Sequence, residues 1–266
     1  MPQGEGSDAK PSALILSIAV LTRHQPDPAQ RLRRMHDALL RAYGPQQWWP
    51  AKTPFDVILG AYLTQNTAWK AVERSLENLR DAGALTVEGL RAVPLKKLRR
   101  LIQPSGFYTR KAPALKAFVA MLDKEFGGSL DVLAGMPTAA LRQWLLDLPG
   151  VGPETADAIL LYALGHSVPV ADEYLRRIAE RHGLLEPAPG RASISYDALA
   201  DLTRRAFAGD AKEKRGPLYN EFHALTVAAG KAHCGRTAHC EKCPLAGDLK
   251  GSFWPLAFSF QLVRPG

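Results

Sequence analysis

The chain has 266 residues, 46% hydrophobic and 23% charged, a composition typical of a globular protein with one large or two small domains. Its formal net charge of +8 and pI of about 9.5 favour a polyanionic partner over a neutral or acidic one. No apolar stretch reaches the ~20 residues that span a bilayer, which argues against a membrane protein. The three cysteines all lie between positions 234 and 243, a better framework for a metal than for disulfides, so we expect a cytoplasmic protein.

Hydrophobic periodicity predicts helices along the whole chain, with no convincing alternating strand. The first predicted helix covers 31–43 and ends at Gly44-Pro45. Pro54 opens a second, whose segment 55–63 is apolar nearly all round and should therefore be central and buried. Further helices are predicted at 69–79, 87–92, 95–102, 111–126, 138–145, 154–164, 172–182, 193–207 and 218–231. The expected fold class is all-α, built from many short helices.

The stretch "LPGVG" at 148–152 stands between two predicted helices. Gly150 and Gly152 allow positive φ and leave the backbone bare, while the N–H groups that open the second helix have no helical partners. Together with the helix dipole, these amides form an anion site that can hold a phosphate without reading a base. The alternative is a purely structural turn, since Gly-x-Gly turns join helices in many proteins.

Several motifs in order resemble one family. "LPGVGPETA", followed by "VADEYLRR", resembles the helix–hairpin–helix, Gly/Pro-rich loop and aspartate signature of base-excision DNA glycosylases related to endonuclease III. "ILGAYLTQNT" resembles the glutamine-bearing segment of that family and "GFYTRKA" its wedge loop, so the resemblance runs from about Trp48 to Cys243. It implies a DNA N-glycosylase acting on double-stranded DNA with a damaged base; we expect a monomer.

The resemblance also implies a domain organisation. Residues 53–164 should form a helical barrel that contains the helix–hairpin–helix, and residues 28–52 and 165–250 a second helical domain that ends in the cysteine loop. Residues 1–27 should be a partly disordered extension. The tail at 251–266 matches no family element.

Asp172 matches the aspartate of the family and is the predicted catalytic residue. Breaking an N-glycosidic bond passes through an oxocarbenium-like transition state, which a nearby carboxylate stabilises while it orients or deprotonates a water. Asp172 also stands where a helix N-cap is expected, and the two roles are compatible because a capped side chain is held still. Glu173 is a rival carboxylate that does not match the motif.

Glu154 departs from the family pattern, in which bifunctional members carry a lysine. That lysine forms a Schiff base with the sugar and leads to strand cleavage, whereas a glutamate cannot form an imine. The resemblance therefore implies a monofunctional enzyme that leaves an abasic site. Lys70, Lys111 and Lys231 do not match the position, and an endonuclease III-like glycosylase and AP lyase is the alternative.

The resemblance assigns further residues to DNA. Gln65 matches the residue that fills the space of the extruded base, and Phe107 or Tyr108 the wedge on the opposite strand. The hairpin contacts are expected at Gly150, Val151, Gly152 and Thr155. Arg110 and Lys111, with the basic run "KKLRR", are candidate phosphate contacts.

Three aromatic residues, Trp48, Trp49 and Phe55, stand where the resemblance places the wall of the base pocket. Aromatic faces hold a flipped base by stacking, and a cationic alkylated purine more strongly through cation–π attraction. The combination looks most like the 3-methyladenine DNA glycosylase branch, which predicts an alkylated purine as substrate. Trp69 and Trp144 have apolar neighbours at helical spacing and are expected in the core.

Cys234, Cys240 and Cys243 resemble the iron–sulfur loop of the family, but the first gap is one residue short and there is no fourth cysteine. A four-iron, four-sulfur cluster takes four thiolates, so His233, His239 or Asp248 would have to complete the set. Zinc and plain reduced thiols remain the other possibilities. The resemblance also implies a monovalent cation at the hairpin.

A non-catalytic helix–hairpin–helix DNA clamp is the alternative from another functional class. A clamp needs neither Asp172 nor an aromatic pocket, and both features favour an enzyme.

Overall fold

The computed structural model describes residues 26–46, 48 and 53–251, and in this part of the chain it is helical, without strands apart from one isolated bridge between Cys234 and Ala238. The helices are α1 (Pro28–Tyr43), α2 (Pro54–Thr64), α3 (Trp69–Asp81), α4 (Val87–Ala92), α5 (Leu95–Leu101), α6 (Tyr108–Phe126), α7 (Leu130–Ala134), α8 (Thr138–Leu146), α9 (Pro153–Ala158), α10 (Glu173–Arg181), α11 (Tyr196–Ala206), α12 (Lys212–Ala232) and α13 (Ala246–Gly251), with a short 3-10 turn η1 (Gln103–Ser105) and a π-helical segment η2 (Ile159–Ala163). The all-α prediction is confirmed.

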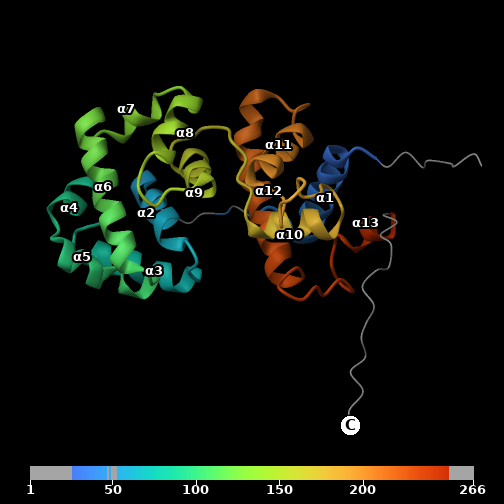
Figure 1. The fold of residues 1–266 in the computed structure, drawn as a ribbon, viewed down its shortest axis with the longest axis horizontal. Coiled ribbons are helices and arrows are strands. Elements are labelled where there is room, and N and C mark those ends of the chain that lie inside the picture. Colours follow the sequence, from blue (N-terminus) through green and yellow to red (C-terminus); the bar gives the residue numbers. More distant parts are fainter. Residues whose placement is uncertain (1–25, 47, 49–52, 252–266) are drawn as a thin grey trace, which may run out of the picture.

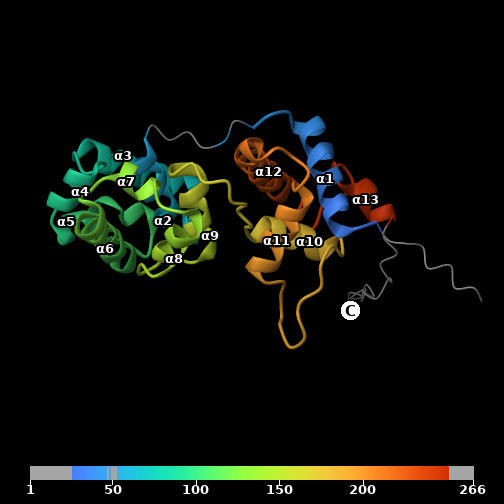
Figure 2. The ribbon, with the colours of Figure 1, turned by 90° about the horizontal axis from the view of Figure 1, so that it is seen from above.

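The helices form two lobes (Figures 1 and 2). The first lobe contains α2 to α9, and the second contains α10 to α13 together with α1 from the other end of the sequence. Each lobe has its own hydrophobic core, one running from Phe55 to Leu164 and the other from Ala29 to Leu245. We propose that the lobes are the two domains expected from the sequence. The extension 1–25 and the tail 252–266 lie outside the described residues.

The helix that follows the hairpin belongs to both cores. Ile159 and Leu160 are buried in the first core, whereas Ala158 and Leu161, on another face, are buried in the second. The helix widens from α9 into the π-helical η2 at this point. A π-helical turn is rare and frequently marks a functional region. The hairpin helix is thus a wall shared by the two lobes.

A buried carboxylate joins the lobes beside this wall. Asp157 of α9 is only 3% exposed, and its two oxygens accept hydrogen bonds from Arg142 of α8 at 2.7 and 3.1 Å. The hydroxyl of Tyr196, at the start of α11 in the second lobe, donates to the same carboxylate at 2.8 Å. These contacts fix the hairpin helices against the second lobe.

Several helix boundaries differ from the sequence prediction. Helix α6 begins at Tyr108, not at 111, so Lys111 lies inside its first turn. Helix α12 begins at Lys212 and runs through Pro217, where the sequence prediction starts only after the proline. The short helices α7 and α13 have too few residues to show a helical period and were not predicted. None of the helices in the described ranges is long and apolar enough to cross a membrane.

Candidate functional site

The hairpin between α8 and α9 has one strained glycine, and it is Gly150. Its φ is +78°, in the left-handed region, and a Cβ added there would lie 3.3 Å from Cβ of Ala114. Gly152 has extended backbone, with φ of −100°, and an added Cβ would meet nothing within 4 Å. The expectation that both glycines supply positive φ is therefore wrong for Gly152, which is the N-cap of α9.

Gln65 reaches this hairpin although it is 85 residues away in sequence. Its side-chain Nε2 donates to the carbonyl of Gly150 at 2.8 Å and to Oγ1 of Thr155 at 3.0 Å. Gln65 is the C-cap of α2, so the end of the central helix sets its position. The structure thus brings together three residues that the sequence assigned to DNA binding.

Of the two predicted wedge residues, Phe107 is the one presented to solvent. Its ring is 51% exposed and its backbone has φ of +46°, whereas Tyr108 is half-buried against the first core. The guanidinium of Arg110 lies 5.2 Å from the centre of the Phe107 ring. The exposed ring and the adjacent cation form a projection at the start of α6.

The side chain of Lys111 is buried, so the prediction that it touches phosphates is wrong. Its Nζ is enclosed by the carbonyls of Leu63, Gln65 and Ser105 and by Oγ1 of Thr67, at 2.8 to 3.0 Å. Burial lowers the pKa of Lys111 to about 8, so the side chain remains mainly protonated at neutral pH. Each buried carbonyl left without this partner would cost about 1–3 kcal/mol.

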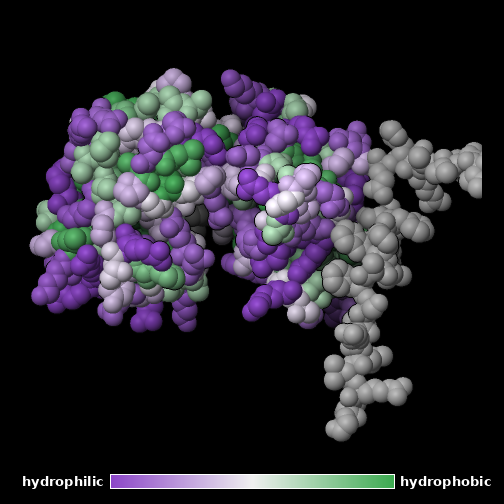
Figure 3. All heavy atoms as spheres, in the orientation of Figure 1, coloured by the Kyte–Doolittle hydropathy of each residue, from purple (hydrophilic) through white to green (hydrophobic). Residues whose placement is uncertain are grey.

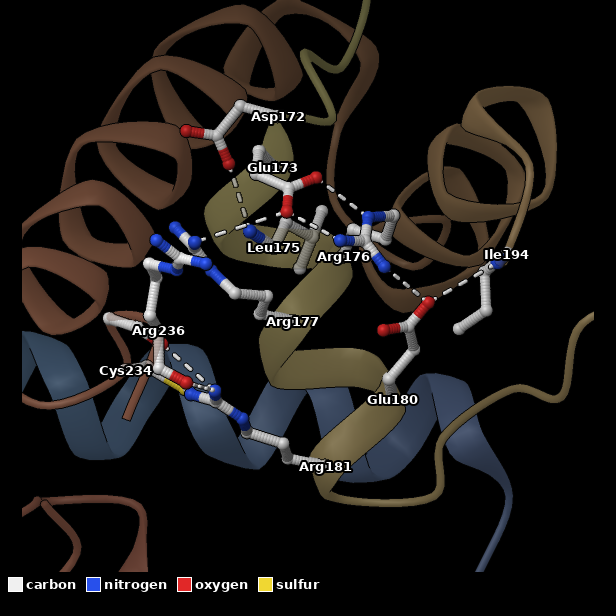
Figure 4. Close-up of polar contacts among 11 residues, drawn as sticks. Asp172, Glu173, Leu175, Arg176, Arg177, Glu180, Arg181, Ile194, Cys234 and Arg236 are labelled. Atoms are coloured by element: carbon white, nitrogen blue, oxygen red, sulfur yellow. Dashed lines mark hydrogen bonds and ion pairs between the residues drawn. The ribbon is translucent and has the colours of Figure 1, made fainter. Parts of the chain in front are cut away.

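Asp172 is the N-cap of α10 and is 7% exposed. One carboxylate oxygen accepts the N–H of Leu175 at 2.9 Å, as Figure 4 shows. The neighbouring Glu173 is instead joined to Arg176 and Arg177 on the outer face of the helix (Figure 4). The cap reading of Asp172 is confirmed, and the cap holds its carboxylate in place for the chemistry that we propose below.

The second carboxylate oxygen of Asp172 faces a histidine that the sequence analysis missed. Nε2 of His223, on α12, lies 3.6 Å from this oxygen, and Nδ1 of the same ring lies 2.7 Å from the hydroxyl of Tyr162 on η2. Burial raises the pKa of Tyr162 well above its ordinary value, so its hydroxyl stays protonated. The imidazole of His223 thus lies between this hydroxyl and the carboxylate of Asp172.

No local signal could have found this pair, because 61 residues separate Tyr162 from His223 and both stand in helical segments that look like core. Trp48 lies against them: its ring centre is 5.0 Å from that of His223 and 6.2 Å from that of Tyr162, both in edge-to-face geometry. The predicted pocket residue Trp48 therefore contacts the surroundings of Asp172.

Phe55 is not a pocket wall. It is 4% exposed and belongs to the first hydrophobic core, because α2 is apolar nearly all round and buries every side. Trp49 lies outside the described residues. Trp69 and Trp144 are half-buried against the first core, and their indole N–H groups donate to Glu73 and Glu125.

Glu154 stands in the first turn of α9, exposed at its surface but crowded by protein. Burial of the charged form, followed by the negative charge of Asp172, raises its pKa to about 7. His223 acts in the opposite direction and lowers it. Glu154 and Asp172 are therefore close enough for their charges to repel each other. The space-filling surface shows a groove between the two lobes (Figure 3).

The three cysteines are arranged unequally. Cys234 is buried and its Sγ lies 2.9 Å from a guanidinium nitrogen of Arg181, whereas Cys240 is exposed. Asp248, a predicted substitute ligand, binds Arg31 and His182 instead. Nδ1 of His233 lies 3.2 Å from the carbonyl of His239. Within the described ranges, no group of three or more His, Cys, Asp or Glu side chains is placed to hold a metal ion.

The chain is similar to known proteins of one family. The family model described as "HhH-GPD superfamily base excision DNA repair protein" matches residues 59–200. A protein of Methanocaldococcus jannaschii, provisionally named a DNA repair glycosylase, is 36% identical over 217 residues, which cover 81% of this chain and 94% of the relative.

Two solved structures share the fold. The structure of the H. pylori 3-methyladenine DNA glycosylase MagIII bound to 1,N6-ethenoadenine has a TM-score of 0.63 and 31% identity, covering 77% of this chain and 98% of the other. A non-covalent endonuclease III–DNA complex has a TM-score of 0.65 and 22% identity, covering 84% and 97%.

The two hairpin glycines predict different effects of substitution. Gly150→Ala should lower the free energy of unfolding by about 1 kcal/mol or more, because alanine is strained at positive φ. Gly152→Ala should lower stability less, since only the N-cap preference is lost. Its added methyl group should hinder the approach of a phosphate and weaken binding equally for damaged and intact duplexes, because a phosphate contact carries no sequence information. Thermal melting and binding titrations at fixed salt test both. A Gly152→Ala protein that loses affinity only for damaged DNA would show that the hairpin shapes the base pocket instead.

The raised pKa of Glu154 predicts a pH-dependent stability. Between its ordinary value of 4.5 and the folded value of about 7, the folded protein binds more protons than the unfolded chain, so stability falls as pH rises through this window. Glu154→Gln should therefore raise the melting temperature more at about pH 8 than at about pH 5. An equal difference at both pH values would contradict the pKa assignment.

Proposed function

The chain belongs to the HhH-GPD superfamily of base-excision DNA repair proteins, and on this premise we propose that it is a monofunctional DNA glycosylase that removes an alkylated purine by hydrolysis. The observation that carries the proposal is the surroundings of Asp172. Its carboxylate is capped by the N–H of Leu175, faces His223 and lies beside Glu154, at the end of the segment that leaves the hairpin helix. A non-catalytic clamp has no use for such a carboxylate.

The proposed reaction is a hydrolysis at C1′ of the damaged nucleotide. The electrons of the N-glycosidic bond leave with the base, and a water oxygen forms the new bond to C1′. Asp172 stabilises the positive charge that develops on the sugar and accepts the proton of the water. The N–H of Leu175 holds one carboxylate oxygen, and the imidazole of His223 lies 3.6 Å from the other, so the orientation of the group is set before the reaction.

Glu154 supports hydrolysis over strand cleavage. It stands where the bifunctional members resembled by this chain have a lysine, and a carboxyl group cannot form a Schiff base. The amine of Lys111 is enclosed by four oxygen acceptors, which makes it unsuitable as a substitute nucleophile. The similarity to the endonuclease III of Bacillus subtilis, 24% identical over 72% of this chain and 78% of the relative, keeps a lyase as the alternative outcome of the experiment below.

Two features support an alkylated purine. Trp48 presents an aromatic ring beside His223, and the carboxylate of Asp172 faces the same histidine. An N-alkylated purine carries a positive charge and is attracted by both. The MagIII structure, with its bound 1,N6-ethenoadenine, shows that a relative of this fold accepts a modified adenine. We place the substrate in double-stranded DNA, bound by a monomer.

Within the part of the chain that the structure describes, the cysteines do not form a complete ligand set for a cluster or for zinc, because Asp248 is engaged elsewhere and Cys234 is bound by Arg181. No step of the proposed reaction therefore passes through a metal.

Product analysis tests the proposal. Duplex oligonucleotides would each carry one modified base: 1,N6-ethenoadenine, 7-methylguanine, hypoxanthine or 8-oxoguanine. We expect release of an alkylated purine, a strand that breaks only after alkaline treatment, and no adduct trapped by borohydride. Asp172→Asn should slow release by roughly 100-fold or more while duplex binding survives.

Glu154→Lys provides the matched control, since an amine at this position should create a borohydride-trappable adduct. Strand breakage or a trapped adduct with the unaltered protein would indicate a lyase. Tight duplex binding without release of any base would indicate a clamp.

A further inference from the structure

Two loops of the first lobe share an unusual backbone. In the described part of the chain, the residues other than glycine with positive φ are Asn66, at +51°, and Phe107, at +46°. Asn66 follows α2 in the loop 65–67, which carries Gln65, and Phe107 ends the loop 105–107 before α6. Asparagine tolerates left-handed backbone, but for a bulky residue such as Phe107 it is unfavourable and persists only where the surroundings impose it.

One buried ammonium group contacts both loops. Nζ of Lys111 donates to the carbonyl of Gln65 at 3.0 Å and to Oγ1 of Thr67 at 2.9 Å in the first loop. It also donates to the carbonyl of Ser105 at 2.9 Å in the second loop, and to that of Leu63 at 2.8 Å in the last turn of α2. Three N–H groups serve four acceptors, so one proton is shared.

A hydrogen bond from Thr67 also joins the two loops directly. Its hydroxyl, which accepts from Lys111, lies 2.6 Å from the carbonyl of Ser105 in the opposite loop and donates to it. Lys111 also lies 5.8 Å from the centre of the Phe107 ring, within range of a cation–π contact. Since α2 directs the negative end of its dipole at the same point, a cation fits there better than a neutral donor.

We propose that Lys111 is a positioning residue that joins the Gln65 loop and the Phe107 loop into one rigid unit, so that both side chains enter a duplex together at the flipped nucleotide. The inference rests on the proposed function, which assigns Gln65 to the space of the extruded base and Phe107 to the opposite strand. Lys111 acts through these two residues and touches neither the base nor the sugar.

A purely structural role for a buried lysine is the competing explanation, and Lys116 provides the matched control. It lies on the same helix, α6, and its Nζ donates to the carbonyls of Leu90 and Arg91 at 2.7 and 2.8 Å. Burial lowers its pKa as it does for Lys111. Lys116 has no contact with either loop among those of its Nζ.

The experiment compares Lys111→Met with Lys116→Met in the full-length protein. The probe is 1,N6-ethenoadenine in two duplexes of one sequence, opposite thymine or opposite an abasic spacer. The spacer leaves no opposite base to be displaced, so opening of the duplex should not require the two loops to act together. Single-turnover excision at saturating protein gives a rate constant for each duplex, and a 2-aminopurine beside the target reports unstacking even without excision.

We expect Lys111→Met to slow excision opposite thymine by roughly tenfold or more relative to excision opposite the spacer, with a matching loss of the 2-aminopurine signal. Lys116→Met should leave this ratio unchanged. If Lys111→Met slows both duplexes equally, or shifts the ratio no more than Lys116→Met does, the proposal is overturned.

Failure of the proposed function gives a different result. The unaltered protein would then excise the base from neither duplex. The 2-aminopurine signal still decides the role of Lys111 in that case. If the unaltered protein gives the signal and Lys111→Met does not, the proposal is supported. If both proteins give the signal, or neither gives it, the proposal is refuted.

Discussion

The carboxylate of Asp157 is the contact on which the relative placement of the functional residues depends. It is buried in the hairpin helix and accepts hydrogen bonds from Arg142 of the preceding helix and from Tyr196 of the second lobe. A buried charge is costly unless every oxygen has a partner, so this arrangement tolerates little displacement of either lobe. Burial of Tyr196, together with the negative charge of Asp157, raises the pKa of Tyr196, so its hydroxyl stays protonated and donates to Asp157.

The hairpin helix presents different groups at its two ends. The end at Gly150 meets Gln65, and the far end leads through the π-helical turn to Tyr162 and on to Asp172. The turn that we propose binds a phosphate and the proposed catalytic carboxylate therefore lie before and after the hairpin helix in the sequence. A glycosylase needs this relation, since the backbone must be held while the nucleotide at the carboxylate is rotated out of the helix.

The electrostatics of the site follow from the same crowding. Glu154 and Asp172 are close enough to repel, and Glu154 takes up a proton near neutral pH. Asp172 has different surroundings, since its carboxylate is capped by the N–H of Leu175 and faced by His223. Environments that separate two carboxylates in this way are typical of sites with acid and base roles.

The sequence predicted what depends on local patterns. The helical periods, the central position of α2 and the cap at Asp172 follow from residue spacing and were confirmed. The burial of Lys111 could not be predicted from local patterns. Its acceptors at Leu63, Gln65 and Thr67 lie 44 to 48 residues away in the sequence, and only the acceptor at Ser105 is nearby. Phe55 was misplaced for a related reason: an aromatic residue at a helix entrance looks the same whether it faces a pocket or a core.

The most direct test of the account is a crystal structure of Asp172→Asn bound to a duplex with one 1,N6-ethenoadenine. We expect one backbone phosphate at the amides of the Gly150–Gly152 hairpin, the modified base beside Trp48, and an ordered water between the side chain at position 172 and C1′ of the flipped sugar. Gln65 and Phe107 should occupy the opened duplex from its two strands. A duplex that lies along another face, with the hairpin amides in solvent and the position-172 side chain separated from the sugar by protein, would contradict it.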